Sequence, residues 1–126
     1  MMWPLTRPFL ERALALDPVG RFWIEDVLIG LLDARLRLWI SWDDEKREVE
    51  AAGVTEIIQY PHARELRIWL VGGKNLRRCG RPFAELLEQF ARDMGCDVMT
   101  GAMRRGWVRV AGPGWMETGY NFEKRL

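Results

Sequence analysis

Hydrophobic positions near the start of the chain recur with the period of an amphipathic helix. Residues 8–16 place their apolar side chains near one face, and Asp17-Pro18 follows as a helix stop. Residues 24–35 repeat the same spacing over a longer stretch. The pattern therefore predicts two consecutive helices that each bury one face.

The next segments alternate apolar and polar residues with the period of a strand. Residues 36–42 place every second, apolar side chain on one face, and the charged residues 43–47 are typical of a hairpin turn. Residues 48–60 form a long β-prone segment in which Gly53 indicates a bulge or kink. Residues 64–71 form the next strand. The middle of the chain thus predicts three antiparallel strands joined by tight turns.

The second half of the chain returns to helical spacing after a basic, glycine-bearing stretch. Its expected elements are a loop at 72–81, a helix from Pro82 to Gly95, a strand at 96–100, a short helix at 104–110 and a last strand at 115–124. A strand–helix–strand crossover makes the strands at 64–71 and 96–100 parallel. We expect one α/β (α+β) domain over residues 1–126, with the order α-α-β-β-β-α-β-α-β and a mixed, mostly antiparallel sheet flanked by helices.

Composition fits an ordinary globular domain, and charge is divided unevenly along it. The 126 residues are 48% hydrophobic and 29% charged, with a net charge of +1. Residues 1–63 hold 7 basic and 11 acidic side chains, whereas residues 64–126 hold 12 and 7. The second half therefore favours an anionic ligand.

The basic loop is the strongest functional lead. Its four cations lie where a strand passes into a helix, and no acidic residue occurs between Glu65 and Glu85. The cations are Lys74, Arg77, Arg78 and Arg81. Because a helix N-terminus presents unpaired N–H groups and a partial positive charge, the segment predicts a phosphate site.

Other chemistries are less favoured by the sequence. The single histidine, His62, argues against a metal cluster or a histidine-based triad. Cys79 and Cys96 do not form a disulfide framework and suit a reducing cytoplasm, and arginines beside Cys79 would lower its thiol pKa. The charged N-terminus does not fit a secretory signal, and no apolar run is long enough for a membrane span.

The order of elements resembles the GNAT N-acetyltransferase fold. GNAT proteins carry a motif Gln/Arg-x-x-Gly-x-Gly/Ala at the helix start, which Arg77-Arg78-Cys79-Gly80-Arg81 matches except that Pro82 takes the last position. The chain is also similar to small GNAT-like proteins of phages and prophages. The shared tracts include Leu38-Trp39-Ile40, Tyr60-Pro61 and Arg105-Gly106-Trp107. This resemblance implies a place in the host cytoplasm or in a phage particle.

The resemblance implies acetyl-CoA as cofactor and assigns residues to it. The pantetheine arm would pair with the strand end, and the pyrophosphate would lie at the helix start. The implied cofactor residues are Leu70, Val71, Gly72, Arg77, Arg78, Gly80 and Arg81. Glu65 or Glu56 would be the base that deprotonates an amine of a small molecule or a protein.

Two alternatives stay open. The GNAT tyrosine that protonates the leaving thiolate corresponds here to Val110, with Tyr120 as a substitute, so the fold is alternatively a non-catalytic virion, assembly or host-interaction protein. An open cleft would favour the enzyme, and a cleft filled by tryptophan or by the loop would favour the interaction protein. Nucleic-acid binding through Arg104, Arg105 and Arg109 is disfavoured by the small net charge.

Overall fold

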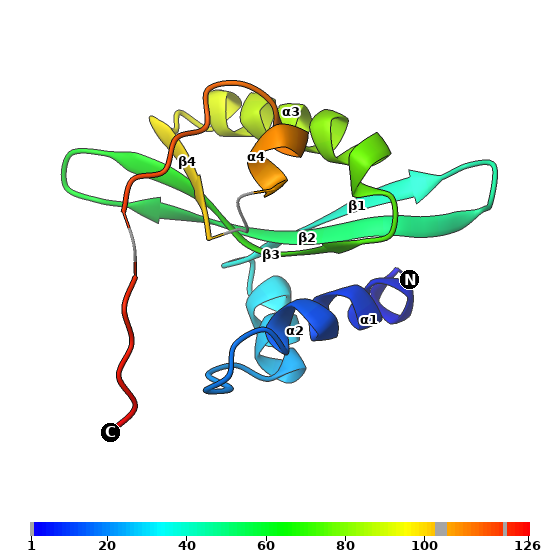
Figure 1. Cartoon of the computed structure of the whole chain (residues 1–126), viewed down its shortest axis with the longest axis horizontal. Helices are drawn as coiled ribbons and strands as arrows, with labels where there is room; N and C mark the ends of the chain where they lie inside the picture. Colours follow the sequence, from blue (N-terminus) through cyan, green and yellow to red (C-terminus); the bar gives the residue numbers. More distant parts are fainter. Residues whose placement is uncertain (1, 103–105, 120) are drawn as a thin grey trace.

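The protein forms three layers in the computed structural model, which describes residues 2–102, 106–119 and 121–126. A four-stranded sheet lies between α1 and α2 on one face and α3 and α4 on the other (Figure 1). The helices are α1 (Trp3–Leu14), α2 (Ile24–Leu32), α3 (Leu76–Asp93) and α4 (Gly106–Ala111). The strands are β1 (Arg37–Asp43), β2 (Glu48–Gln59), β3 (Arg64–Gly73) and β4 (Val98–Gly101).

The sheet has the predicted mixed topology. Its spatial order is β1-β2-β3-β4, with antiparallel pairing along the β1–β2–β3 meander. Strand β4 is parallel to β3 because α3 carries the chain back across the sheet. The order of elements is confirmed from α1 to α4.

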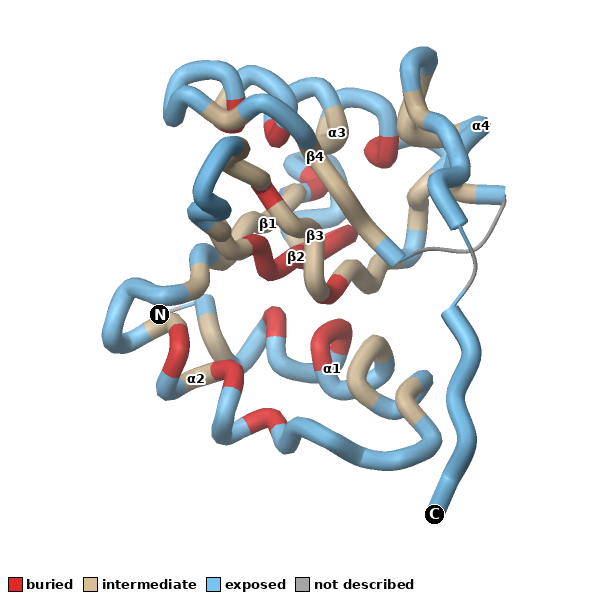
Figure 2. The backbone as a smooth tube through the Cα atoms, turned by 90° about the vertical axis from the view of Figure 1, so that its left-hand side faces the viewer, coloured by how far each residue is buried: buried red, intermediate tan, exposed pale blue. Residues whose placement is uncertain are grey.

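Two hydrophobic clusters hold the helices to opposite faces of the sheet. On the α1–α2 side, Leu10 and Val27 are fully buried against Val54 of β2. On the α3 side, Leu87 packs against Leu66 of β3, which is also fully buried. Figure 2 shows the buried residues on the strands and on the helix faces turned toward them. The apolar helix faces that the sequence predicts are therefore buried against the sheet.

Helix α3 begins at Leu76, so the prediction of a loop up to residue 81 is wrong. The backbone N–H groups of Arg78 and Cys79 both donate to the Asn75 carbonyl, at 3.0 and 2.9 Å, and close the first turn. Pro82 lies inside the helix rather than at its start. A proline inside a helix removes its own N–H from the ladder and crowds the carbonyl four residues before it, yet here the helix continues through Pro82.

The predicted last strand is also wrong, because the described residues of 115–124 form no strand. Met116 is 81% and Phe122 91% exposed, so the alternating apolar residues reach no core. The neighbouring sheet edge, β4, offers only four residues for pairing. The segment instead runs away from the sheet (Figure 1). Tyr120, with Arg104 and Arg105, lies outside the described residues.

Within the described part of the chain, no helix is both long and apolar enough to span a bilayer.

Candidate functional site

Strand β3 extends beyond its parallel partner β4, and no other strand among the described residues pairs with this part of its edge. Pairing with β4 runs only from Glu65↔Val98 to Ile68↔Gly101. Strand β3 continues to Gly73, so residues 69–73 have no β4 partner on that side. An unpaired strand edge can accept an extended ligand through main-chain hydrogen bonds. The predicted cofactor residues Leu70, Val71 and Gly72 all lie on this free edge.

A bulge at Trp69 marks the point where β3 and β4 part. In the β2–β3 register Thr55 pairs with Ile68 and Val54 pairs with Leu70, so Trp69 is the extra residue. Its indole packs on the α1–α2 side, where it meets the Phe22 ring edge-on with centroids 4.8 Å apart. The Trp69 side chain therefore lies on the α1–α2 face of the sheet and does not fill the cleft between β3 and β4.

Arg78 is paired with two buried carboxylates, which neutralise its charge although its own side chain is 58% exposed. Its Nη2 atom lies 3.1 Å from Oδ2 of Asp43 and also bonds Glu50, and both acids are only 5% exposed. The backbone N–H of Lys46, together with the Arg78 charge, lowers the pKa of Asp43 below its ordinary value. Glu50 is the extra residue of a second bulge, opposite Ser41 and Trp42. Arg78 thus links α3 to the β1–β2 hairpin and is a poor candidate for a phosphate ligand.

Replacing Arg78 with alanine should lower the melting temperature at pH 7, because two buried carboxylates lose their counter-ion. The folded-state pKa of Asp43 is lowered, so its stabilising contribution is full above its unfolded pKa and is lost as pH falls. The destabilisation should therefore shrink below about pH 4. Calorimetric scans from pH 3 to pH 7 measure this, with the exposed Arg77→Ala as control. Equal melting temperatures for the two variants at pH 7 would contradict the role of Arg78.

Of the other residues predicted to bind phosphate, Arg77 and Arg81 lie on the surface, whereas Gly80 packs against another helix. Arg77 is exposed on the first turn of α3. Arg81 is exposed too, but its Nε lies 3.4 Å from Oε1 of Glu85. Gly80 is buried, and a Cβ on it would lie 2.1 Å from Cγ1 of Val110 in α4. Gly80 therefore serves the packing of α4 on α3 and is covered rather than open to a ligand.

Cys79 is not the activated thiol that its neighbouring arginines suggested. The side chain is buried, and burial together with the nearby Glu50 charge raises the pKa of the thiol. A raised pKa keeps the thiol protonated and unreactive near neutral pH.

Glu56 lines a groove beside the bulge, whereas Glu65 does not. Oε1 of Glu56 lies 3.0 Å from Nη1 of Arg67, its partner across the β2–β3 ladder. This groove has a volume of about 440 Å³ and is lined by Arg21, Phe22, Asp26, Ile29, Arg35, Leu36, Glu56, Arg67 and Trp69. Arg67 and Trp69 flank Ile68, the last β3 residue paired with β4, so the groove lies next to the free strand edge. Glu65 lies at the other end of the parallel pairing.

The groove combines an aromatic wall with charged side chains of both signs. Phe22 and Trp69 form the aromatic contact, and Arg21 and Asp26 come from the segment between α1 and α2 and from α2 itself. No spacing in the sequence marks Arg21 or Phe22 as site residues; only the fold brings them under β3. Among the described residues, no group of three or more histidine, cysteine or acidic side chains is arranged to hold a metal ion.

The fold is that of the GNAT acetyltransferases. A probable acetyltransferase superposes with a TM-score of 0.72 at 11% identity, covering 99% of this chain and 92% of that one. An aminoglycoside acetyltransferase from an uncultured soil metagenomic sample gives 0.70 at 12% identity, covering 98% and 88%. Glucosamine-6-phosphate N-acetyltransferase from Arabidopsis thaliana gives 0.61 at 14%, covering 92% and 89%. These likenesses establish the GNAT-like mixed sheet that the sequence predicted.

Sequence comparison adds little to the structural likeness. No protein-family model matches the chain. A DNA polymerase of Thermococcus hydrothermalis is 38% identical over 91 residues, which are 69% of this chain and 5% of the polymerase. The chain thus spans about one-twentieth of that relative's length, and the match concerns a small segment of it.

Proposed function

We propose that this protein binds acetyl-CoA along the free edge of β3 and transfers the acetyl group to an amine held in the 440 Å³ groove. The observation that carries the proposal is the extension of β3 past β4, straight into the start of α3. The unpaired part of β3 begins beside the groove at Arg67 and Trp69 and ends shortly before the first turn of α3. In the proposed complex the cofactor would lie along this stretch, with its acyl end toward the acceptor in the groove.

The residues present suit an extended thioester cofactor with a phosphorylated end. The backbone of Leu70, Val71 and Gly72 would pair with the pantetheine arm, because this edge has no β4 partner. The first turn of α3 and the exposed Arg77 would hold the pyrophosphate. The phosphate seat is confined to this first turn because Val110 covers Gly80. Bound acetyl-CoA would supply the activated acyl group.

The acceptor groove supplies a base and a binding wall. Glu56 would take up the proton that the acceptor amine loses, and its ion pair with Arg67 fixes the position of the carboxylate. Phe22 and Trp69 would pack against the apolar part of the acceptor. The acceptor is thus a small molecule, or an exposed amine of a protein, able to enter beside β3.

Calorimetric titration with acetyl-CoA tests the cofactor site. We expect micromolar affinity, about −8 kcal/mol, and weaker binding by Arg77→Ala. The matched control is Arg92→Ala, because Arg92 is an exposed arginine in the last turn of the same helix. Absence of heat and of any thermal shift at millimolar acetyl-CoA would overturn the proposal, as would equal loss of affinity in both variants.

A non-catalytic GNAT-fold protein is the second candidate. One observation favours it: Val110, to which the GNAT resemblance assigns the tyrosine position, packs over Gly80. Such a protein would serve in a virion, in assembly or in contact with a host protein. A negative titration with acetyl-CoA would favour this candidate.

A further inference from the structure

Strand β1 forms one border of the sheet and presents a free backbone edge to solvent. The order β1-β2-β3-β4 leaves its outer side unpaired within the part of the chain that the structure describes. Proteins usually cover or disrupt such an edge, because its peptide groups are ready to pair with another strand. This edge is seven residues long and carries apolar side chains, so it is able to pair with a second strand.

Charges at the two ends of this edge are opposite in sign. Arg35 and Arg37 lie at the start of β1, and the exposed Asp44 and Glu45 follow its end. Lys46 and Arg47 also belong to the turn, on the side that leads into β2, the strand paired with the inner edge of β1. At the other end Arg35 forms an ion pair with Asp33 at 2.8 Å, so Arg37 supplies the remaining positive charge. If two copies of β1 pair antiparallel, the basic start of each meets the acidic end of the other. Parallel pairing would oppose like charges.

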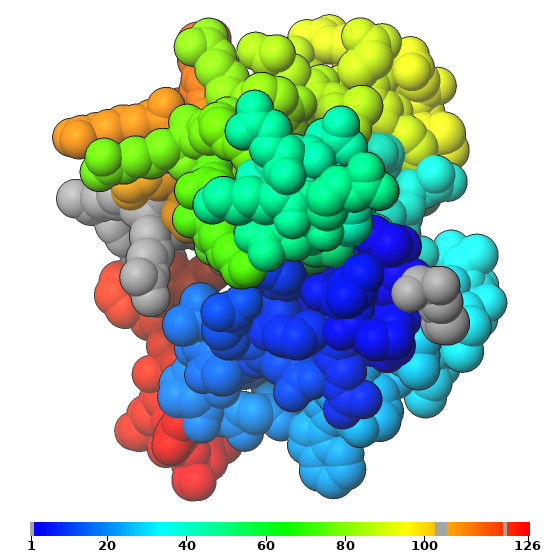
Figure 3. Space-filling view, turned by 90° about the vertical axis from the view of Figure 1, so that its right-hand side faces the viewer, coloured from blue at the N-terminus to red at the C-terminus, as the bar shows by residue number. Residues whose placement is uncertain are grey.

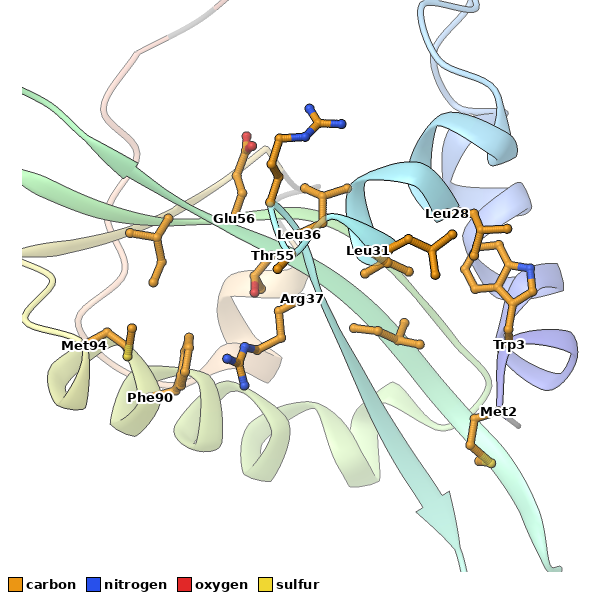
Figure 4. Close-up of a pocket in the computed structure, with 15 residues that line it drawn as sticks. Met2, Trp3, Leu28, Leu31, Leu36, Arg37, Thr55, Glu56, Phe90 and Met94 are labelled. Carbon is orange, nitrogen blue, oxygen red and sulfur yellow. The ribbon is translucent and has the colours of Figure 1, made fainter.

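A groove of about 850 Å³ lies at the start of β1 and is lined from both faces of the sheet (Figure 4). Trp3 and Leu31 come from α1 and α2, and Phe90 comes from α3. The groove exists because β2 continues past β1: Arg37↔Thr55 is the first β1–β2 pair, and residues 56–59 of β2 have no β1 neighbour. This end of the edge therefore has apolar walls with room between them.

The other end of the same edge carries an exposed tryptophan. Trp42 is 42% exposed, and it shares the α1–α2 face of β1 with Leu38 and Ile40. Figure 3 shows the β1–β2 hairpin (teal) at one end of the molecule, directly beside α1 (blue). In an antiparallel register that places Ile40 opposite its own copy, Trp42 of the second copy lies opposite Leu38, which lines the groove.

We propose that the protein forms a two-fold dimer through antiparallel pairing of β1 with β1 of a second copy, centred on Ile40. One register satisfies the free peptide edge, opposes unlike charges and brings each Trp42 to the groove of the other copy. The two sheets then form one continuous sheet of eight strands, twice the four of a single chain. An isologous contact of this kind closes on itself and leaves no free β1 edge. The dimer does not depend on the acetyltransferase proposal.

Sedimentation velocity on the full chain tests the interface. We expect a dimer at concentrations of roughly 10–100 µM, and a monomer for Trp42→Glu. Trp23→Glu is the matched control, because Trp23 is 74% exposed but lies away from β1, and it should remain dimeric. A wild-type chain that is monomeric throughout this range overturns the proposal. A dimer that persists in Trp42→Glu also overturns it.

A charge exchange tests the direction of pairing even if Trp42→Glu does not fold. The register centred on Ile40 places Arg35 opposite Glu45 of the second copy. Arg35→Glu alone and Glu45→Arg alone should each weaken the dimer, and the combined variant should restore it. Failure of the combination to restore dimerisation contradicts the antiparallel register. Oxidation of Ile40→Cys in a Cys96→Ser background should link two chains across the two-fold axis. Cys96→Ser alone, in which the remaining Cys79 is buried, should stay unlinked under the same conditions.

Discussion

Replacing Glu56 with glutamine should lower kcat/KM for acetyl transfer by about 100-fold or more, the usual contribution of a positioned general base. The carboxylate lines the groove beside the bulge at Trp69 and is fixed by Arg67 at 3.0 Å. Glutamine keeps the size of the side chain but cannot accept the proton of the acceptor amine. Affinity for acetyl-CoA should be unchanged, because the cofactor would bind to the edge of β3 and not to β2. A coupled assay of thiol release measures the rate.

Glu65→Gln is the matched control for this experiment. Glu65 is the other glutamate that the sequence offered as base, and it lines neither of the two grooves. Its replacement should leave kcat/KM nearly unchanged. If Glu65→Gln lost activity while Glu56→Gln kept it, the acceptor would have to lie at the opposite end of the β3–β4 pairing. Melting temperatures of both variants separate loss of chemistry from loss of the Glu56–Arg67 ion pair.

Replacing Gly72 with alanine should destabilise the fold by about 1–3 kcal/mol, the range for overpacking in a tight interior. A Cβ on Gly72 would lie 2.6 Å from the backbone carbonyl oxygen of Phe9, which cannot move unless α1 shifts. Helix α1 lies directly on the end of β3, so relief of this clash moves the same strand edge that would hold the cofactor. Urea unfolding measures the stability, and titration with acetyl-CoA reports the disturbance of the edge.

Gly119→Ala provides the control for this substitution. A Cβ at Gly119 meets no atom within 4 Å, so the change should alter the free energy of unfolding by less than about 0.5 kcal/mol. If Gly72→Ala were as stable as Gly119→Ala, α1 would not be packed on β3 as tightly as the structure has it.

The sequence predicted the sheet and its helices because each buries one periodic apolar face. The wrong predictions concern two segments, the start of α3 and residues 115–124, in which the local sequence pattern is a poor guide to the structure. The sequence pattern predicts a helix start at Pro82, yet the first turn begins at Asn75, whose carbonyl accepts two backbone N–H groups. The alternation in residues 115–124 resembles a strand, but alternation alone cannot show that a four-residue neighbour is too short to pair with it.

The site was only partly predictable for a different reason. The GNAT resemblance implies the strand backbone at Leu70–Gly72, and in the structure this stretch lies beyond the last pair of β3 with β4. Contacts far apart in the sequence were not predictable: Arg78 reaches Asp43 and Glu50 on the hairpin, and Phe22 lies under Trp69. Nor can spacing distinguish Glu56 from Glu65, because only the fold shows that Glu56 borders a groove, whereas Glu65 pairs with Ile58 nearer the β2–β3 turn.

The sheet divides the interior into two hydrophobic clusters, and this division affects how mutations can accumulate in the chain. Leu10 and Val27 share no contact surface with Leu87 and Ala91, so substitutions on one side should add to those on the other without coupling. The α1–α2 layer supplies walls of the acceptor groove, whereas α3 starts at the proposed phosphate seat. Mutations on the α1–α2 face can therefore change the acceptor of the proposed enzyme without altering the α3 face, which would hold the phosphates.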